Sequence, residues 1–288
     1  MPQLTADLER KLTHAVDRMP AFPRSVQKVL ELTRNINCMP KELVAVIEKD
    51  PVMTVKILKV INSAYYSLPN KVTSVNQSVV YLGINTIKNL SLSFAAAGML
   101  PRINVAGFDI QRYLTHSLST AAVSRQLCAV YAKSEADPGD CYVAGLLHDF
   151  GKVVFAQFLA TDFREVLLRG ASCGSPLYQI EREMIGADHA YVGALLARKW
   201  QFPEHLVQCI GNHHDPAAPS SAMLDCLRIA DQICRGIGPE PGEPPAWVGQ
   251  SPVVSRFGDD MNTVVAGLGD LAKIIADATL LVQIDGGA

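Results

Sequence analysis

The nine residues from Ala144 to Lys152 read Ala-Gly-Leu-Leu-His-Asp-Phe-Gly-Lys, and they are the most informative stretch of this 288-residue chain. His148 and Asp149 place an imidazole beside a carboxylate, and these donors suit a borderline or hard divalent metal ion. The two leucines before them are apolar, and an acid beside buried surface needs a cation or hydrogen bonds. Lys152 follows one helical turn later and could meet the charge of a phosphate held by the ion. The stretch therefore fits a metal-assisted phosphohydrolase, in which the ion polarises a phosphoryl oxygen and activates water.

Further candidate ligands lie at wide intervals along the chain. Each has a structural alternative, such as a polar helix flank, a helix start after Asp188, or an exposed helix end where cationic imidazole suits the helix dipole. These structural alternatives become weaker when all the candidates are considered together. Apolar residues also precede the last acid of the set, Asp231, and such an acid again needs a partner. No Cys-x-x-Cys pair is present, so the sequence indicates no thiolate cluster and no structural zinc site. The candidates are His116, His189, His213, His214 and Asp231.

The hydrophobic pattern predicts an all-α fold. Apolar residues recur at spacings of three and four from Leu4 to Val282, whereas the alternation typical of strands is absent. Pro101 and Gly107 mark a junction between two lobes. We expect four segments: an N-terminal helical lobe over residues 1–100, a helical lobe with the His/Asp cluster over 101–235, a Pro/Gly-rich loop over 236–260, and a C-terminal helix over 261–288.

The apolar stripe of the last segment is too broad for a helix free in water. We therefore expect this helix to dock on the body of the same chain, with a partner interface as the second choice. The side chains expected to be buried are Leu268, Leu271, Ile275 and Ala278.

The N-terminal lobe shows helix signals and no catalytic constellation. Asp50-Pro51 is typical of a helix start, because Asp accepts hydrogen bonds from free amides and Pro fits the first turn. Asn62 is interpreted as a cap or turn former, and Gly83 as the break between two helices. The apolar face expected for the helix after Pro51 consists of Val52, Val55, Ile57, Leu58 and Ile61.

Composition excludes several classes of protein. The 26 basic and 28 acidic residues give a net charge of −2, so no polycationic surface favours DNA or an acidic membrane. The N-terminus has charged first turns unlike a signal peptide, and no apolar run is long enough to span a bilayer. The seven cysteines are odd in number and mostly have apolar neighbours. Reduced, buried thiols and a cytoplasmic location are expected.

The order His, His-Asp, His, His-His, Asp resembles the HD superfamily of metal-dependent phosphohydrolases. The resemblance is closest to its regulatory branch, the HDOD (HD-related output domain) proteins of bacterial signalling. It covers about residues 16–235 and includes several separate N-terminal motifs in the family's order. These motifs are Met19–Pro23, Ile47–Pro51, Ile57–Tyr66 and Val75–Gly83.

The resemblance implies a metal site and two alternative functions. One function is a signal-transduction output module that acts through signalling protein partners, as in a response regulator. The other is a phosphohydrolase acting on a nucleotide or phosphate ester, with Lys152 and Asp149 as catalytic residues. A nucleotide is thus a candidate ligand and a homodimer a candidate assembly, and the donor set does not distinguish Fe, Mn, Zn, Ni and Mg. By resemblance, His116, His148, Asp149 and Asp231 bind one ion, and His189, His213 and His214 bind a second or line the cleft.

The chain departs from the active branch of the superfamily in one segment. HD-GYP phosphodiesterases carry an acidic, glycine-rich stretch after the paired histidines, ending in Gly-Tyr-Pro. Here Asp215-Pro216-Ala217-Ala218-Pro219 follows His214 instead. Because that stretch helps those enzymes to hold the dinucleotide, we predict no hydrolysis of cyclic-di-GMP.

Overall fold

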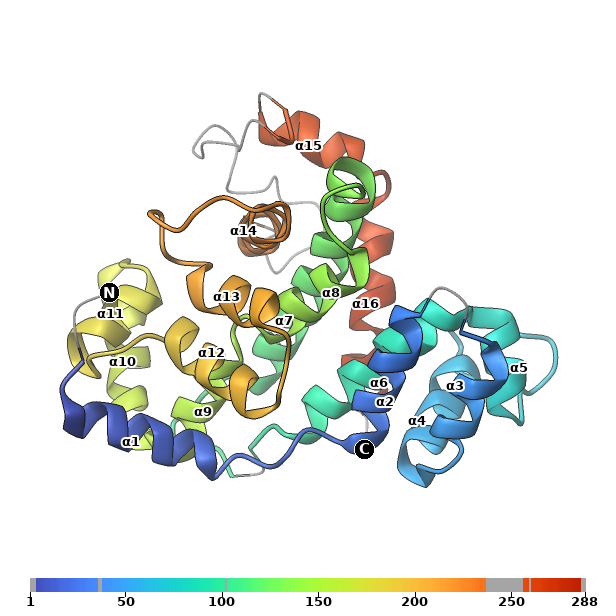
Figure 1. Ribbon diagram of the computed structural model, residues 1–288, viewed down its shortest axis with the longest axis horizontal. Coiled ribbons are helices and arrows are strands. Elements are labelled where there is room, and N and C mark those ends of the chain that lie inside the picture. The colour runs from blue at the N-terminus through green and yellow to red at the C-terminus, as the bar shows by residue number, and fades with distance from the viewer. Residues whose placement is uncertain (1–3, 36–37, 102, 237–255, 259, 286–288) are drawn as a thin grey trace. The chain divides into compact units, whose positions relative to one another are not determined.

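The computed structural model describes residues 4–35, 38–101, 103–236, 256–258 and 260–285 (Figure 1). All regular secondary structure in these ranges is helical, which confirms the predicted all-α fold. The chain forms two compact units. The larger unit comprises residues 1–20 and 100–276, and the smaller comprises residues 21–99 and 277–288. The four-segment division expected from the sequence stays a prediction.

The smaller unit contains five consecutive helices whose ends follow local sequence signals. Asp50 caps α4 as expected, because its Oδ1 accepts a hydrogen bond from the Met53 amide at 3.0 Å. The Asn62 side chain bonds to both the amide and the carbonyl of Val72, which confirms it as a turn former. Gly83 separates α5 from α6 with φ of 78°, a conformation that favours glycine. The helices are α2 (Arg24–Arg34), α3 (Pro40–Ile47), α4 (Pro51–Ile61), α5 (Val75–Leu82) and α6 (Ile84–Gly98).

The predicted apolar face of α4 is partly wrong. Val52 and Val55 are 68% and 65% exposed, whereas Met53 and Val60 are buried together with Ile57 and Ile61. Apolar residues occupy two faces of this helix, so spacing alone does not decide which face packs inward.

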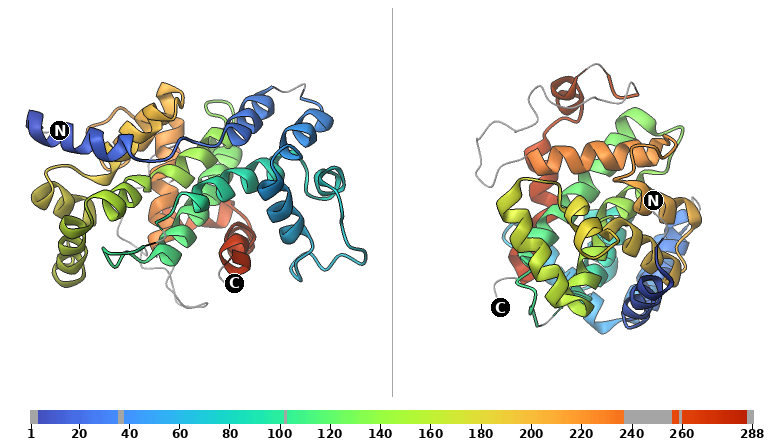
Figure 2. Two further views of the ribbon diagram at one scale, coloured as in Figure 1. Left: turned by 90° about the horizontal axis from the view of Figure 1, so that it is seen from below. Right: turned by 90° about the vertical axis from the view of Figure 1, so that its left-hand side faces the viewer.

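The larger unit is built around three helices that pack closely on one another, α7, α8 and α14 (Figure 1). Beside these three helices, α12 packs on α9 and α13 (Figure 2). The helices α10 and α11 pack on each other. The N-terminal helix α1 also packs on α9 and α12. The helices are α1 (Ala6–Asp17), α7 (Ile110–Leu127), the π-helix η1 (Cys128–Ala132), α8 (Pro138–Leu147), α9 (Phe150–Phe158), α10 (Ala160–Cys173), α11 (Leu177–Met184), α12 (His189–Lys199), α13 (Glu204–Asn212) and α14 (Ala222–Gly236).

Two glycines allow these helices to approach. A Cβ atom at Gly145 of α8 would lie 2.6 Å from the Cα of Ala121 in α7. A Cβ atom at Gly151 of α9 would lie 2.0 Å from the backbone oxygen of His189 in α12. Both separations are far shorter than van der Waals contact, so only glycine fits at either position.

The C-terminal stripe forms two helices, α15 (Met261–Gly267) and α16 (Leu271–Asp285), rather than one. They are separated at Gly269, whose φ is 82°. The first docks within the larger unit: the Tyr131 hydroxyl donates to the carbonyl of Val264 at 3.2 Å, and Gln126 donates to that of Leu268 at 3.1 Å. Of the four side chains expected to be buried, Leu268 is buried, whereas Leu271, Ile275 and Ala278 are only half-buried. The predicted loop falls largely on 237–255, outside the described residues.

The seven cysteines are all free, as expected for reduced thiols, but the expectation that they are buried is partly wrong, because Cys173 is exposed and Cys38 and Cys234 are half-buried. The expectation that no thiolate cluster exists is wrong, because the sulfur atoms of Cys128, Cys141 and Cys226 lie within 4.8 Å of one another. These residues are far apart in sequence and meet only because η1, α8 and α14 pack together. Among the described helices, none combines the length and hydropathy needed to cross a bilayer.

Candidate metal centre

The central pair of the site occupies a corner between two helices. His148 is the C-cap residue of α8 and Asp149 directly precedes α9, so no loop separates the helices at this point. Both side chains are buried. The corner fixes an imidazole and a carboxylate on the same side of the helix junction.

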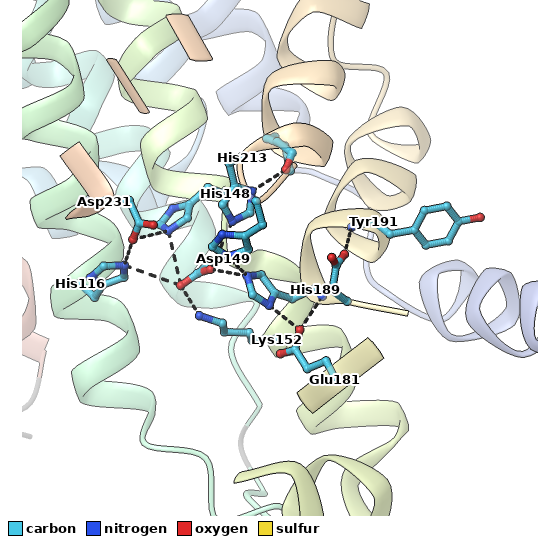
Figure 3. A network of polar contacts seen from close by, with 12 residues as sticks. His116, His148, Asp149, Lys152, Glu181, His189, Tyr191, His213 and Asp231 are labelled. Carbon is cyan, nitrogen blue, oxygen red and sulfur yellow. Dashed lines mark hydrogen bonds and ion pairs between the residues drawn. The ribbon is translucent and has the colours of Figure 1, made fainter. Parts of the chain in front are cut away.

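The structure brings His116 and Asp231 to this pair from α7 and α14 (Figure 3). His116 Nε2 lies 3.1 Å from Asp231 Oδ1 and 3.7 Å from Asp149 Oδ2. His148 Nε2 lies 3.4 Å from Asp149 Oδ2 and 3.7 Å from Asp231 Oδ1. The four side chains that the sequence assigns to one ion therefore converge on a common space.

The remaining three histidines approach Asp149 from its other carboxylate oxygen. His189, the first residue of α12, places Nε2 3.0 Å from Asp149 Oδ1, and His213 Nε2 lies 3.9 Å from the same oxygen. His214 Nε2 lies 3.0 Å from His189 Nε2. Asp149 thus lies between two groups of candidate ligands.

Backbone carbonyls determine the tautomers of two buried histidines. His148 Nδ1 lies 2.8 Å from the carbonyl oxygen of Gly145, and His213 Nδ1 lies 2.6 Å from that of Ile210. Because a carbonyl oxygen only accepts, each Nδ1 carries the proton, and in the neutral ring each Nε2 has a free lone pair. Both Nε2 atoms are buried without a hydrogen-bond partner among the described residues. Histidines that bind metal ions commonly donate their other N–H in this way, so the residues present fit a divalent cation.

Glu181 of α11 is a member of the site that the sequence did not reveal (Figure 3). Its Oε2 accepts hydrogen bonds from Nδ1 of His189 at 2.5 Å and from the His189 amide at 2.8 Å. Burial lowers the pKa of His189, but the charges of Glu181 and Asp149 outweigh it and raise the pKa to about 9. Glu181 orients His189 as an outer carboxylate orients a metal-binding histidine.

Cations balance the buried acids. Lys152 Nζ lies 2.5 Å from Asp149 Oδ2, and Arg235 Nε donates to Asp231 Oδ1 at 2.9 Å. Burial would raise the pKa of Asp149, but His148, Lys152 and His189 hold it well below its ordinary value. For Asp231, burial is similarly outweighed by Arg235 and by the adjacent imidazoles, so its pKa is also lowered. Both carboxylates are ionised, as metal ligands must be.

Two histidines are kept neutral. Burial, reinforced by the charges of neighbouring histidines, lowers the pKa of His213 well below its ordinary value and also lowers that of His214. The His214 ring stacks on Tyr178 with the ring centroids 4.3 Å apart. Neutral imidazole is the form that binds metal ions.

The centre opens into a cavity of about 1030 Å³ within the larger unit. The metal-site residues that reach its wall are His116 and Asp149, and the cations at the wall are Arg112, Lys152 and Arg235. Apolar and polar side chains from α7, α10, α11, α14 and α16, and from the residues just before α7, complete the lining. The cavity is large enough for a small organic ligand, and its cations suit a negatively charged one.

Comparison with known proteins confirms the family. A model of the HDOD domain matches residues 19–216. An uncharacterised protein of Treponema pallidum is 26% identical over 234 residues, which cover 80% of this chain and 45% of that protein. The chain spans less than half the length of this and other curated relatives that it matches.

Solved structures support the same assignment. A candidate phosphohydrolase from Shewanella amazonensis has 25% identity and a TM-score of 0.74, with 95% of this chain and 97% of that chain covered. An HDOD domain protein of unknown function from Geobacter sulfurreducens has 25% identity and a TM-score of 0.75, covering 96% and 97% of the two chains. The chain belongs to the HDOD domain family.

Proposed function

We propose that the protein is a signalling module of the HDOD type that binds a divalent metal ion in its His/Asp cluster and acts on a protein partner. The observation that carries the metal site is the pair of buried, unpartnered Nε2 atoms of His148 and His213. Lone pairs without a partner are costly in a protein interior, and a cation beside each Nε2 atom would satisfy it. His116, His148, Asp149 and Asp231 would hold one ion, with His189, His213 and His214 as the second set.

The charges of the cluster determine how the affinity for a metal ion depends on pH. Three carboxylates, Asp149, Glu181 and Asp231, face Lys152, Arg235 and a His189 whose pKa is about 9. A cation near His189 would therefore displace its proton, and its affinity would rise with pH.

Metal binding is tested by calorimetric titration of chelator-treated protein with Mn²⁺, Fe²⁺, Zn²⁺, Ni²⁺ and Mg²⁺ separately. We expect at least one of them to bind with release of a proton, and the His148→Ala variant to lose this binding. His14→Ala removes an exposed histidine of α1 and serves as the matched control. Equal binding by His148→Ala and the unmodified protein would refute the assignment.

The partner is expected on the smaller unit, where two adjacent helices expose large apolar side chains. On α4 these are Val52 and Val55, and on α5 they are Val80 and Tyr81, 77% and 61% exposed. Contiguous exposed apolar surface is typical of binding sites, and these four side chains are the candidates for such a surface. In a deletion strain with a measurable phenotype, Val55→Asp with Val80→Asp should abolish complementation without changing metal binding or the melting temperature. Full complementation by this variant would contradict a partner surface here.

A second candidate function, phosphohydrolysis, is favoured by the cavity. Lys152 and Arg235 lie on its wall beside the candidate metal ligands, where they would hold the negative charge of a phosphate ester or nucleotide. A bound ion would polarise the phosphoryl oxygen and activate water. The metal-loaded protein should be assayed against simple phosphate esters, nucleotides and cyclic-di-GMP. Turnover lost in Lys152→Ala would favour the enzyme, whereas metal binding without turnover of any substrate would favour the module.

A further inference from the structure

Three buried thiols meet outside the His/Asp cluster. Cys128 begins η1, Cys141 lies on α8 and Cys226 lies on α14. All three are fully buried and free, and their sulfur atoms lie within 4.8 Å of one another. A metal ion bonded at about 2.3 Å to three sulfurs in one plane sets those sulfurs about 4 Å apart. The cluster therefore needs only a small contraction to surround an ion.

Cys128 lies at an irregular point of the backbone. It is the first residue of a π-helical turn, and such turns occur frequently at functional sites. That turn packs on both α8 and α14, the helices that carry Cys141 and Cys226. Convergence thus depends on an irregular turn as well as on ordinary helix packing.

The thiols also interact chemically. Hydrogen bonds from Cys141 and then Cys226 lower the pKa of Cys128 below its ordinary value. The same contacts with Cys128 raise the pKa of both partners. An isolated core cysteine behaves as a small apolar residue, whereas these three thiols interact with one another, and the Cys128 thiol also donates to the carbonyl of Ala136 at 3.3 Å.

The three thiols lie on the same helical segments as three members of the His/Asp cluster. The three helical segments that carry them also carry His116, His148 and Asp231: α7 leads from His116 to Cys128, α8 from Cys141 to His148, and α14 from Cys226 to Asp231. The same three-helix packing therefore assembles one group of nitrogen and oxygen donors and one group of sulfur donors.

We propose that Cys128, Cys141 and Cys226 form a second metal site, which binds Cu(I) through three sulfurs. Soft thiolates select Cu(I), whereas structural zinc sites almost always have four ligands. No fourth His, Cys, Asp or Glu belongs to this group among the described residues, and all three thiols are buried. On binding, the ion replaces the S–H protons, which pass to solvent, and the copper keeps its oxidation state.

The test is anaerobic titration of the reduced, metal-free full chain with Cu(I) in competition with a chromophoric chelator. We expect one equivalent to bind at the thiols, with sulfur-to-copper absorption in the ultraviolet. X-ray absorption at the copper edge should show three sulfur neighbours. Cys226→Ser should lose the absorption and weaken binding by more than the roughly 10-fold typical of losing an outer-shell partner. Cys209→Ser, buried outside the cluster, and Cys173→Ser, exposed, should retain both properties.

Two results would overturn the site. Equal Cu(I) binding by Cys226→Ser would exclude the thiols, and nitrogen neighbours in the copper spectrum would place the ion among the histidines. If Cys226→Ser does not fold, the spectrum of the unmodified protein decides, because it reports the donor atoms directly. The outcome is independent of divalent metal binding at the His/Asp cluster, which His148→Ala tests separately.

Discussion

Replacing Gly151 by alanine tests how the candidate metal centre is held together. The added Cβ atom would lie 2.0 Å from the backbone oxygen of His189 and 2.7 Å from its carbonyl carbon. Ordinary contact begins at 3.4 Å, so α9 and α12 must separate locally by about 1.4 Å. The atoms in the way belong to the backbone, and no side-chain rotation relieves the clash.

The expected cost follows from that displacement. Overpacking of a protein interior typically costs about 1–3 kcal/mol. For a domain of this size, each kcal/mol lowers the melting temperature by roughly 2–4 °C. A separation of this size would also disturb the 3.0 Å contact between His189 Nε2 and Asp149 Oδ1. We therefore expect Gly151→Ala to melt roughly 2–12 °C lower and to bind the divalent ion at least about 10-fold more weakly.

Scanning calorimetry and metal titration measure the two effects on one sample. Gly98→Ala is the matched control, because Gly98 ends α6 in a right-handed backbone conformation and nothing lies within 4 Å of its added Cβ. That control should be neutral or stabilised by up to about 1 kcal/mol. Melting and metal binding of Gly151→Ala equal to those of the unmodified protein would contradict this expectation.

Three further predictions concern the same unit. Glu181→Gln keeps the size of the side chain but removes the charge behind His189, so divalent metal affinity should fall by about 10- to 100-fold in a calorimetric titration; unchanged affinity would contradict that role. Because the pKa of His189 is raised to about 9, the stability that its charge contributes is complete below about pH 6.5 and is lost as the pH rises through 9. The melting temperature of the metal-free protein, measured against pH, should fall over this range, and the fall should be smaller in Glu181→Gln. Equal pH dependence of the two proteins would exclude this contribution of His189. Truncation before Ser251 removes the docked α15 and should lower the melting temperature, whereas unchanged melting of the truncated protein would show that the docking adds no stability.

The central pair of the His/Asp cluster stands out in the sequence because its signals are local. His148 and Asp149 are adjacent, and their apolar neighbours indicate a buried position. The convergence of the distant histidines came from the family resemblance, since no spacing within the chain fixes it. Glu181 was missed for a physical reason: Glu183, two residues later on the same helix, has the same chemistry but is largely exposed.

The other differences arise from packing between elements. Val55 and Ile57 of α4 are equally apolar, and only the neighbouring helices decide which is buried. The break at Gly269 lies inside a continuous apolar stripe, where hydrophobic spacing alone gives no stop signal. The thiol group has no short sequence spacing at all, so it becomes visible only when η1, α8 and α14 are assembled.

The shared framework of α7, α8 and α14 gives the two donor groups a thermodynamic relation. Ions at the two groups would both constrain the packing of these helices, and any effect of one ion on that packing would change the free energy of binding of the other. Linkage requires this effect to be reciprocal: the factor by which a divalent ion changes the affinity for Cu(I) equals the factor by which Cu(I) changes the affinity for the divalent ion. In a signalling module, such a framework would let the availability of one metal set the response to another.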